Sequence, residues 1–202
     1  MNNLESVSRE TRARLEAFAA LLLRWNGTVN LIARRDEPEL WPRHIADSFQ
    51  LAPLIPPSIS RGIDLGTGGG FPGLVLAIAT NIPFDLIESD HRKAAFLREA
   101  GRATQAPIRV HAVRAETARI DPAPLITSRA LAPLPRLLAL AAPLLAPNGI
   151  CLFLKGAAAQ TELTAAAAEW HMHVERVASQ TVHNACILRI SDIARVHDNA
   201  RS

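Results

Sequence analysis

The sequence predicts an α/β protein with a mostly parallel, seven-stranded sheet, helices on both of its faces, and a helical extension at the N-terminus. From Arg61 onward, short apolar runs alternate with longer segments of helical periodicity, a pattern typical of βαβ units. A glycine-rich turn joins the first of these runs to the first helical segment. The 202 residues are 49% hydrophobic and 20% charged, which suffices for one domain with its own core and excludes a disordered chain.

Two helices are expected before the sheet. Apolar side chains recur every three or four residues over 8–25, which indicates an amphipathic helix that ends at Asn26-Gly27. The same spacing over 37–54, with Pro38 near its start, predicts a second helix, which later prolines terminate. We therefore expect residues 1–60 to pack on the sheet domain as an extension.

The sheet domain is expected to span residues 61–191. Its strands are predicted at 62–65, 84–87, 108–113, 125–127, 150–154, 172–177 and 185–190. Its helices are predicted at 72–80, 91–104, 134–145 and 160–170. Residues 192–202 are polar and are expected to form a flexible tail.

The composition says more about the cellular location of the protein than about its function. Residues 1–14 are polar, and no apolar run reaches the length of a membrane span, so we expect a cytoplasmic protein. Cys151 and Cys186 lie in apolar runs, which predicts buried structural thiols. The net charge is +3, and Lys93 and Lys155 are the only lysines. Such a preference for arginine fits either RNA binding or a biased genome composition, and charge does not decide between them.

The segment from Asp64 to Gly73 predicts a ligand site. A strand runs into the turn Gly66-Thr67-Gly68-Gly69-Gly70, and Pro72 then suits the first turn of a helix. Glycines let the backbone approach a ligand and expose amides at the helix end, where an anionic group is favoured. A merely tight loop is the structural alternative.

The glycines alone do not identify the ligand, since a G-x-G-x-x-G pattern also fits a dinucleotide. Glu88 ends the second strand, where a carboxylate can accept hydrogen bonds from both hydroxyls of an adenosine ribose. Nicotinamide cofactors and S-adenosylmethionine both contain this ribose. Asp64 before the first glycine, and Ala115-Glu116 after the third strand, favour S-adenosylmethionine. A nicotinamide-dependent oxidoreductase remains the alternative, although the chain has no tyrosine for a Tyr-x-x-x-Lys pair.

Several blocks along the chain together resemble one family. They are Trp25-Asn26 with Val29-Asn30-Leu31, Arg43-His44 with Asp47-Ser48, Asp64–Gly73, Glu88-Ser89 with Lys93 and Phe96-Leu97, Arg114-Ala115-Glu116, Thr127-Ser128-Arg129-Ala130, and Leu154-Lys155-Gly156. In this order they resemble the bacterial small-subunit rRNA guanine-N7 methyltransferases, also called glucose-inhibited division protein B. The resemblance extends roughly from Leu15 to Ile190, and the glycine turn and the Ser-Arg-Ala block are its most specific parts.

The resemblance implies a class I, Rossmann-like fold that binds S-adenosylmethionine and methylates one guanine of 16S rRNA in the small ribosomal subunit. The residues it implies for cofactor binding are Gly66, Gly68, Gly70, Phe71, Glu88, Ala115, Glu116 and Arg129. Of these, Gly66 and Phe71 would flank the methionine part, Glu88 the ribose, and Ala115 with Glu116 the adenine, with Arg129 at the mouth of the site. Phe71 as plain core packing and Glu116 as a helix-end carboxylate are the structural alternatives.

The predicted chemistry needs no general base, because guanine N7 carries a lone pair and no proton. No catalytic side chain is therefore assigned, and no metal site is expected, since the histidines lack the usual partners. Arg43, His44 and Lys155 are the candidates for RNA or base contacts, with a structural histidine as the alternative for His44. A small-molecule methyltransferase and a non-enzymatic rRNA-binding assembly factor remain open, and nothing indicates an obligate dimer or another protein partner.

Overall fold

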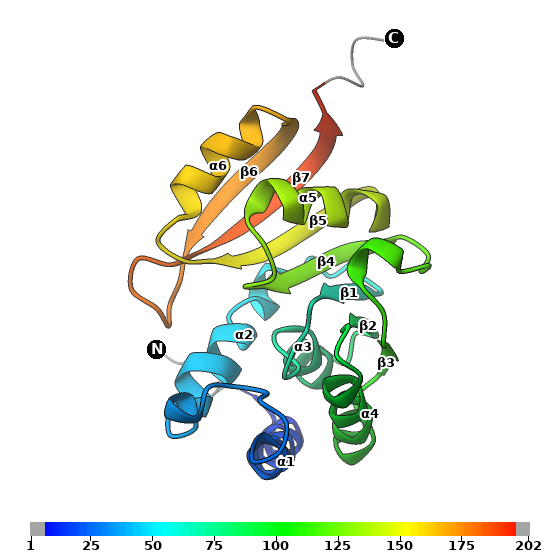
Figure 1. Cartoon of the computed structure of the whole chain (residues 1–202), viewed down its shortest axis with the longest axis vertical. Helices are drawn as coiled ribbons and strands as arrows, with labels where there is room; N and C mark the ends of the chain where they lie inside the picture. The colour runs from blue at the N-terminus through cyan, green and yellow to red at the C-terminus, as the bar shows by residue number, and fades with distance from the viewer. Residues whose placement is uncertain (1–6, 197–202) are drawn as a thin grey trace.

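The computed structural model describes residues 7–196, which form a sheet between two layers of helices (Figure 1). The strands are β1 (Gly62–Leu65), β2 (Phe84–Ile87), β3 (Ile108–His111), β4 (Ala123–Arg129), β5 (Leu145–Lys155), β6 (Trp170–Ala178) and β7 (Cys186–Arg195). The α-helices are α1 (Arg9–Asn26), α2 (Asp47–Phe49), α3 (Gly73–Thr80), α4 (His91–Thr104), α5 (Leu134–Ala141) and α6 (Ala159–Ala167). Short 3-10 or π turns are η2 (Arg34–Asp36), η3 (Trp41–Ala46), η4 (Ala52–Leu54), η5 (Ala115–Thr117) and η6 (Ala142–Leu144).

The sheet has seven strands in the order β3-β2-β1-β4-β5-β7-β6, so the predicted architecture is confirmed. All neighbours pair in parallel except β7, which runs antiparallel to both β5 and β6. The strand order reverses between β1 and β4, and ligands of open parallel sheets bind at the carboxyl ends of strands on either side of such a point. This topology therefore places the glycine turn after β1 beside the end of β4.

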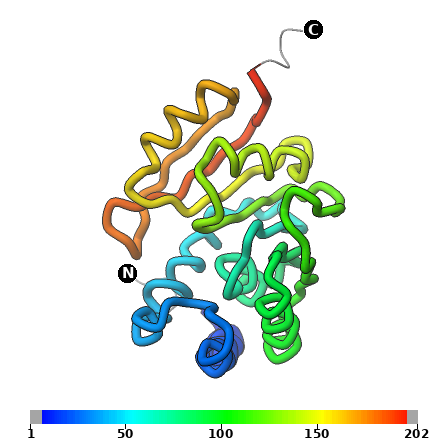
Figure 2. The backbone as a smooth tube through the Cα atoms, in the orientation of Figure 1, coloured from blue at the N-terminus to red at the C-terminus, as the bar shows by residue number. Residues whose placement is uncertain are grey.

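Side chains alternate along the strands between two apolar cores, one on each face of the sheet. Figure 1 shows α1, α3 and α4 on one face and α5 and α6 on the other. In β2, Leu86 contributes to the core beneath α1, α3 and α4, which holds Phe18 and Phe96. The next residue, Ile87, contributes to the core under α5 and α6, which holds Leu138. The N-terminal helix thus shares a core with the sheet, and Figure 2 shows the chain passing from that layer to the β6–β7 hairpin at the other end.

The predicted second helix over 37–54 is wrong as a continuous α-helix. The structure instead has the π turn Trp41–Ala46, a single α turn over Asp47–Phe49, and a 3-10 turn over Ala52–Leu54. The apolar spacing is helical, but Pro42 has no amide hydrogen to donate within a regular helix. The π turn accommodates this segment with a wider hydrogen-bond spacing.

The C-terminal end of the sheet domain differs from the prediction. The last strand does not stop near Ser191 but continues to Arg195, because Ala194 and Arg195 pair with His171 and Trp170 of β6. The predicted flexible tail is therefore strand over 192–195, and 197–202 lie outside the described residues. Both cysteines are buried and unbridged, as predicted. Over residues 7–196, no helix combines the length and the apolar character that crossing a bilayer requires.

Gly73, the first residue of α3, has no room for a side chain. A Cβ there would lie 2.5 Å from the Asp64 Cβ and 2.7 Å from the Leu86 Cδ2. We expect Gly73→Ala to lower the free energy of unfolding by about 1–3 kcal/mol through overpacking. Denaturant unfolding measures this, with Gly156→Ala as the control, because a Cβ at Gly156 meets nothing within 4 Å. Equal losses in the two variants would contradict the close packing.

Candidate functional site

Asp64, the third residue of β1, organises the glycine turn from beneath. Its carboxylate is fully buried, accepts a hydrogen bond from the Gly73 amide at 3.0 Å and another from the Thr127 hydroxyl at 2.7 Å. Burial raises the pKa of Asp64 to about 6, although these hydrogen bonds oppose the shift. Asp64 thus ties β1 to the start of α3 and to the neighbouring strand β4.

Glu88, directly after β2, holds the turn from the side. One carboxylate oxygen accepts the Gly68 amide at 2.9 Å and the other accepts the Asp90 amide at 2.8 Å. The residue is 8% exposed and lines a cavity. An ionised carboxylate has about four acceptor positions, so Glu88 retains capacity for two further donors. These two acceptor positions match the two hydroxyls of a ribose, each of which donates one hydrogen bond.

A cavity of about 320 Å³ opens over the carboxyl ends of β1 and β2. Five predicted cofactor residues line it: Gly66, Gly68, Glu88, Ala115 and Glu116. Ser89, Lys93, Leu131 and Arg136 also line it, although no sequence motif assigned them to the cofactor. The cavity combines a glycine turn with positive φ at Gly66 and Gly68, the Glu88 carboxylate with two unused acceptor positions, and apolar walls. Its residues therefore fit an adenosine-containing cofactor.

Gly70 and Phe71 do not line this cavity. Phe71 is 3% exposed, and its ring centroid lies 5.5 Å from that of Phe18 and 5.1 Å from that of His44. A Cβ at Gly70 would lie 3.2 Å from Leu74. These two residues face the core shared with α1, where Phe71 packs against Phe18.

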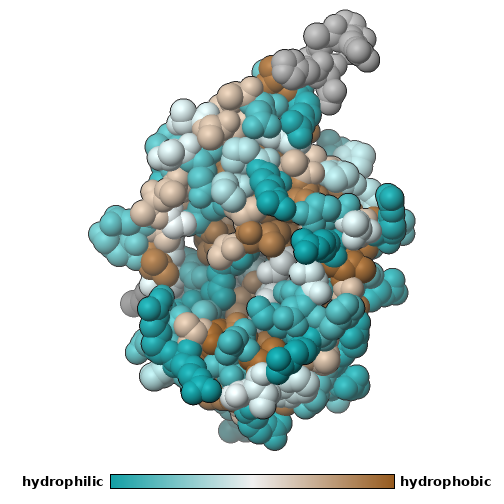
Figure 3. All heavy atoms as spheres, in the orientation of Figure 1, coloured by the Kyte–Doolittle hydropathy of each residue, from teal (hydrophilic) through white to brown (hydrophobic). Residues whose placement is uncertain are grey.

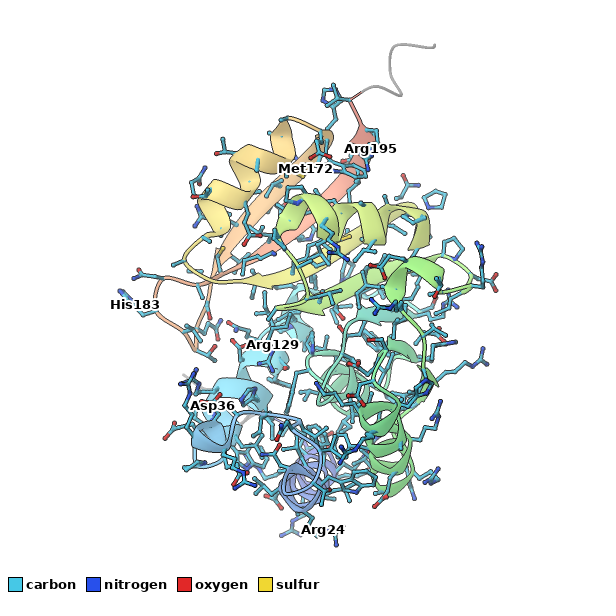
Figure 4. All side chains as sticks on the ribbon, in the orientation of Figure 1. Arg24, Asp36, Arg129, Met172, His183 and Arg195 are labelled. Carbon is cyan, nitrogen blue, oxygen red and sulfur yellow. The ribbon has the colours of Figure 1, made fainter. Side chains whose placement is uncertain are left out.

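Arg129, the last residue of β4, points toward the N-terminal segment rather than into the first cavity (Figure 4). Its guanidinium donates to the Asp47 carboxylate at 3.2 Å, to the Arg43 carbonyl at 3.1 Å and to the His44 Nδ1 at 2.8 Å. It also lies 4.9 Å from the centre of the Phe71 ring. Arg129 therefore joins the end of β4 to the helical extension.

A second cavity, of about 540 Å³, lies on the other side of the loop that follows β4. Ala130, Leu131 and Ala132 line both cavities, so the two share one wall. Arg129 and Lys155 line the second cavity, together with Glu162, which the sequence did not single out. In Figure 3, a hollow in the displayed face is bordered by apolar residues on part of its rim and by hydrophilic residues on the rest.

Of the three predicted RNA or base contacts, Lys155 lines the second cavity, whereas Arg43 and His44 line neither of these two cavities. Arg43 is largely exposed, with its guanidinium 3.5 Å from the Asp36 carboxylate. His44 is partly buried, and its Nδ1 accepts a hydrogen bond from Arg129, so the proton is on Nε2, which lies 3.8 Å from Asp36. Asp36 thus faces both residues, and no sequence signal indicated this, because the pairing depends on the π turn.

Burial, reinforced by the positive charge of Arg129, lowers the pKa of His44 from 6.5 to about 4. Between these values the unfolded chain binds a proton that the folded chain does not, so stability falls as the pH falls. We expect His44 to account for a loss of about 3 kcal/mol between pH 6.5 and pH 4. Urea unfolding across this pH range tests it by comparing the wild type with His44→Gln.

The exposed His171 provides the matched control for this experiment. His171→Gln should keep the acid dependence of the wild type, whereas His44→Gln should flatten it. Parallel pH profiles for the wild type and His44→Gln would contradict the partly buried, neutral imidazole.

The comparisons with known proteins agree with this geometry. A family model described as rRNA small subunit methyltransferase G matches residues 11–188. The ribosomal RNA small subunit methyltransferase G of Gluconobacter oxydans is 56% identical over 193 residues, which cover 96% of this chain and 100% of that protein. The protein of the same name from Acidiphilium cryptum is 58% identical over 204 residues, with 94% of each chain covered.

Two solved structures show the same fold at low identity. A ribosomal protein L11 methylase from Lactobacillus delbrueckii has a TM-score of 0.60 and 13% identity, over 74% of this chain and 78% of that one. An O-methyltransferase from Bacillus cereus, in complex with SAH, has a TM-score of 0.59 and 14% identity, over 87% of this chain and 90% of that one. The methyltransferase fold predicted from the sequence is therefore confirmed.

Proposed function

Because the chain belongs to the rRNA small subunit methyltransferase G family, a family of S-adenosylmethionine-dependent enzymes, we propose that it methylates N7 of a single guanine in 16S rRNA. The observation that carries this proposal is the pair of cavities that share the wall 130–132. One cavity has the glycine turn and carboxylate suited to an adenosine, and the other has cationic and apolar walls suited to a base.

In the first cavity, the proposed role of Glu88 is to accept the ribose hydroxyls, and that of Ala115 and Glu116 is to border the adenine. Gly66 leaves the backbone accessible next to Leu131, where a Cβ would lie only 2.5 Å from a leucine methyl group. S-adenosylmethionine bound there supplies a methyl group on a positively charged sulfur. Asp64 acts indirectly in this proposal, because it holds the turn without lining the cavity.

The proposed reaction requires positioning and no proton acceptor. The N7 atom attacks with its own lone pair, so the chain's residues need only hold the base in line with the methyl group. Arg129 stays fixed by its three partners and keeps the wall of the second cavity in place. Gly70, Phe71 and His44 support this arrangement from the core rather than by contact with a ligand.

Arg43 is proposed to contact an RNA phosphate, because its side chain is exposed while its backbone carbonyl holds Arg129. RNA of the small ribosomal subunit is the proposed partner, and the cytoplasm is the proposed location.

We propose that the protein is a monomer, with residues 1–60 as an extension of the catalytic domain. Four large apolar side chains are exposed among the described residues, and three of them line the two cavities: Val113, Leu131 and Val182. These three side chains are therefore accounted for by the proposed ligand sites rather than by a subunit interface.

The test is the transfer of labelled methyl from S-adenosylmethionine to small ribosomal subunits and to naked 16S rRNA, both from cells that lack the modification. Borohydride and aniline treatment cleaves RNA at N7-methylguanosine, so scission at one guanine is the expected result. Comparing the two substrates shows whether ribosomal proteins are needed to present the RNA. Label that enters RNA without producing scission would overturn the N7 assignment, and the absence of label would overturn the rRNA substrate.

A further inference from the structure

The second cavity contains an ion pair whose hydrogen bonds are incomplete. The Lys155 ammonium donates to the Glu162 Oε2 at 2.7 Å and to the Ala132 carbonyl at 2.8 Å. The Leu134 amide donates to the same Oε2 at 2.7 Å. Within residues 7–196, the other oxygen of Glu162, Oε1, accepts no hydrogen bond, and one of the three N–H groups of Lys155 has no acceptor.

Both oxygens of Asp47, the other carboxylate on this cavity, already accept hydrogen bonds from the protein. One oxygen of Asp47 accepts Gln50 at 2.8 Å and Thr181 at 2.6 Å, and the other accepts Arg129 at 3.2 Å. Of these two carboxylates, Glu162 is therefore the one with an oxygen that accepts no hydrogen bond from the described residues. Lys155 is 8% exposed, so the pair is pre-organised and largely shielded from water.

Apolar side chains complete the cavity. Leu131 and Val182 both line it and are 38% and 43% exposed. A base taken out of an RNA stack is commonly held between apolar surfaces and recognised by hydrogen bonds along its Watson–Crick edge. The cavity thus offers two apolar surfaces, an acceptor and a donor.

This combination matches guanine. Its Watson–Crick edge places two adjacent donors, N1–H and the N2 amine, beside the O6 acceptor. Adenine presents an acceptor at N1, which would face the negative oxygen of Glu162, and uracil has one donor between two acceptors. A carboxylate beside an ammonium is therefore complementary to guanine and repels adenine.

We propose that Glu162 selects guanine as the methylated base. Its free Oε1 accepts from N1–H and from the N2 amine, while Lys155 donates to O6. Both contacts lie on the Watson–Crick side of the ring, which leaves N7 free for the methyl group. The inference rests on the proposed function, since it names the group by which the same site recognises its substrate.

The test replaces Glu162 by glutamine and replaces the target guanosine by inosine, which keeps N7, N1–H and O6 but lacks the N2 amine. In reconstituted small subunits, the wild type should methylate guanosine about tenfold to a hundredfold faster than inosine, the discrimination typical of a paired base contact. Glu162→Gln retains an oxygen for Lys155 but presents an amide N–H₂ to the guanine donors. Its rate on guanosine should fall to the level of its rate on inosine.

Glu169→Gln is the matched control, because Glu169 follows α6 and pairs with Arg195 at the surface, away from the cavity. It should retain the wild-type rate and the wild-type preference for guanosine. Calorimetric binding of S-adenosylhomocysteine, expected to match the wild type in both variants, separates loss of recognition from loss of structure. A thermal melt should show that both variants are folded at the assay temperature, with a lower midpoint for Glu162→Gln because Lys155 loses its carboxylate partner.

A binding measurement separates this inference from the proposed function. Oligoribonucleotides that carry guanosine or inosine are compared by fluorescence anisotropy, with S-adenosylhomocysteine present. A guanosine preference that disappears in Glu162→Gln supports the inference even where no methyl is transferred, which would overturn only the reaction. A wild type that binds and methylates both bases equally, or a variant that keeps the wild-type preference, overturns the role of Glu162.

Discussion

Replacing Glu88 by alanine is expected to weaken the binding of S-adenosylmethionine by at least about a hundredfold. In the proposed site, its carboxylate accepts two ribose hydroxyls, and each hydrogen bond to a charged group contributes about 1.5–3 kcal/mol. The substitution also removes the acceptor of the Gly68 amide, so the glycine turn loses its lateral support. Isothermal titration calorimetry with the cofactor or with S-adenosylhomocysteine measures the change directly.

Asp90→Ala is the control for disturbing this turn. The Asp90 side chain caps α4 by accepting the Arg92 and Lys93 amides, and it does not line the cavity. Its removal should lower stability through the loss of the cap and change cofactor affinity by less than about threefold. If Glu88→Ala retained wild-type affinity, the ribose role of Glu88 would be wrong.

Arg129→Ala is expected to lower the free energy of unfolding by about 3–5 kcal/mol, because it leaves a buried carboxylate without its cation. Asp47 would retain Gln50 and Thr181 as donors, but nothing would balance its charge. The His44 Nδ1 and the Arg43 carbonyl would also lose their donor. Denaturant unfolding at neutral pH measures the loss.

Arg136→Ala provides the comparison, because Arg136 pairs with Glu116 at 2.9 Å but is 68% exposed. An exposed pair contributes little, so this variant should lose less than about 1 kcal/mol. A double-mutant cycle of Arg129 with Asp47 isolates the buried interaction. Similar losses for the two arginines would show that burial does not strengthen the Arg129–Asp47 contact.

Local patterns predicted the elements near the glycine turn accurately. The bounds of β1, β2 and α4 coincide with those expected from apolar runs and helical spacing. Each of these elements is delimited by residues close in sequence, such as Asp90, which caps α4. The cavity that contains Gly66, Gly68 and Glu88 could be predicted for the same reason, because parallel strand ends meet along one edge.

Features that depend on distant residues were not predictable in this way. The extension of β7 to Arg195 requires pairing with Trp170, and the orientation of Arg129 requires Asp47, which lies 82 residues earlier. Neither partner is visible in a local pattern. Phe71 shows the same limit, since its motif suggested a ligand contact, whereas Phe18 of α1 occupies one side of its ring.

The division of the core between two faces of the sheet has a consequence for synthesis on the ribosome. Most side chains of one core, from Leu15 to Ala100, belong to the first half of the chain, whereas the helices of the other core begin only at Leu134. A nascent chain can therefore bring α1, α3 and α4 together while the opposite surface of β1, with Ile63 and Leu65, is still uncovered. During translation, this apolar face of β1 is thus exposed until α5 and α6 have been synthesised. A pause in translation before α5 would prolong this exposure and favour aggregation of the nascent chain.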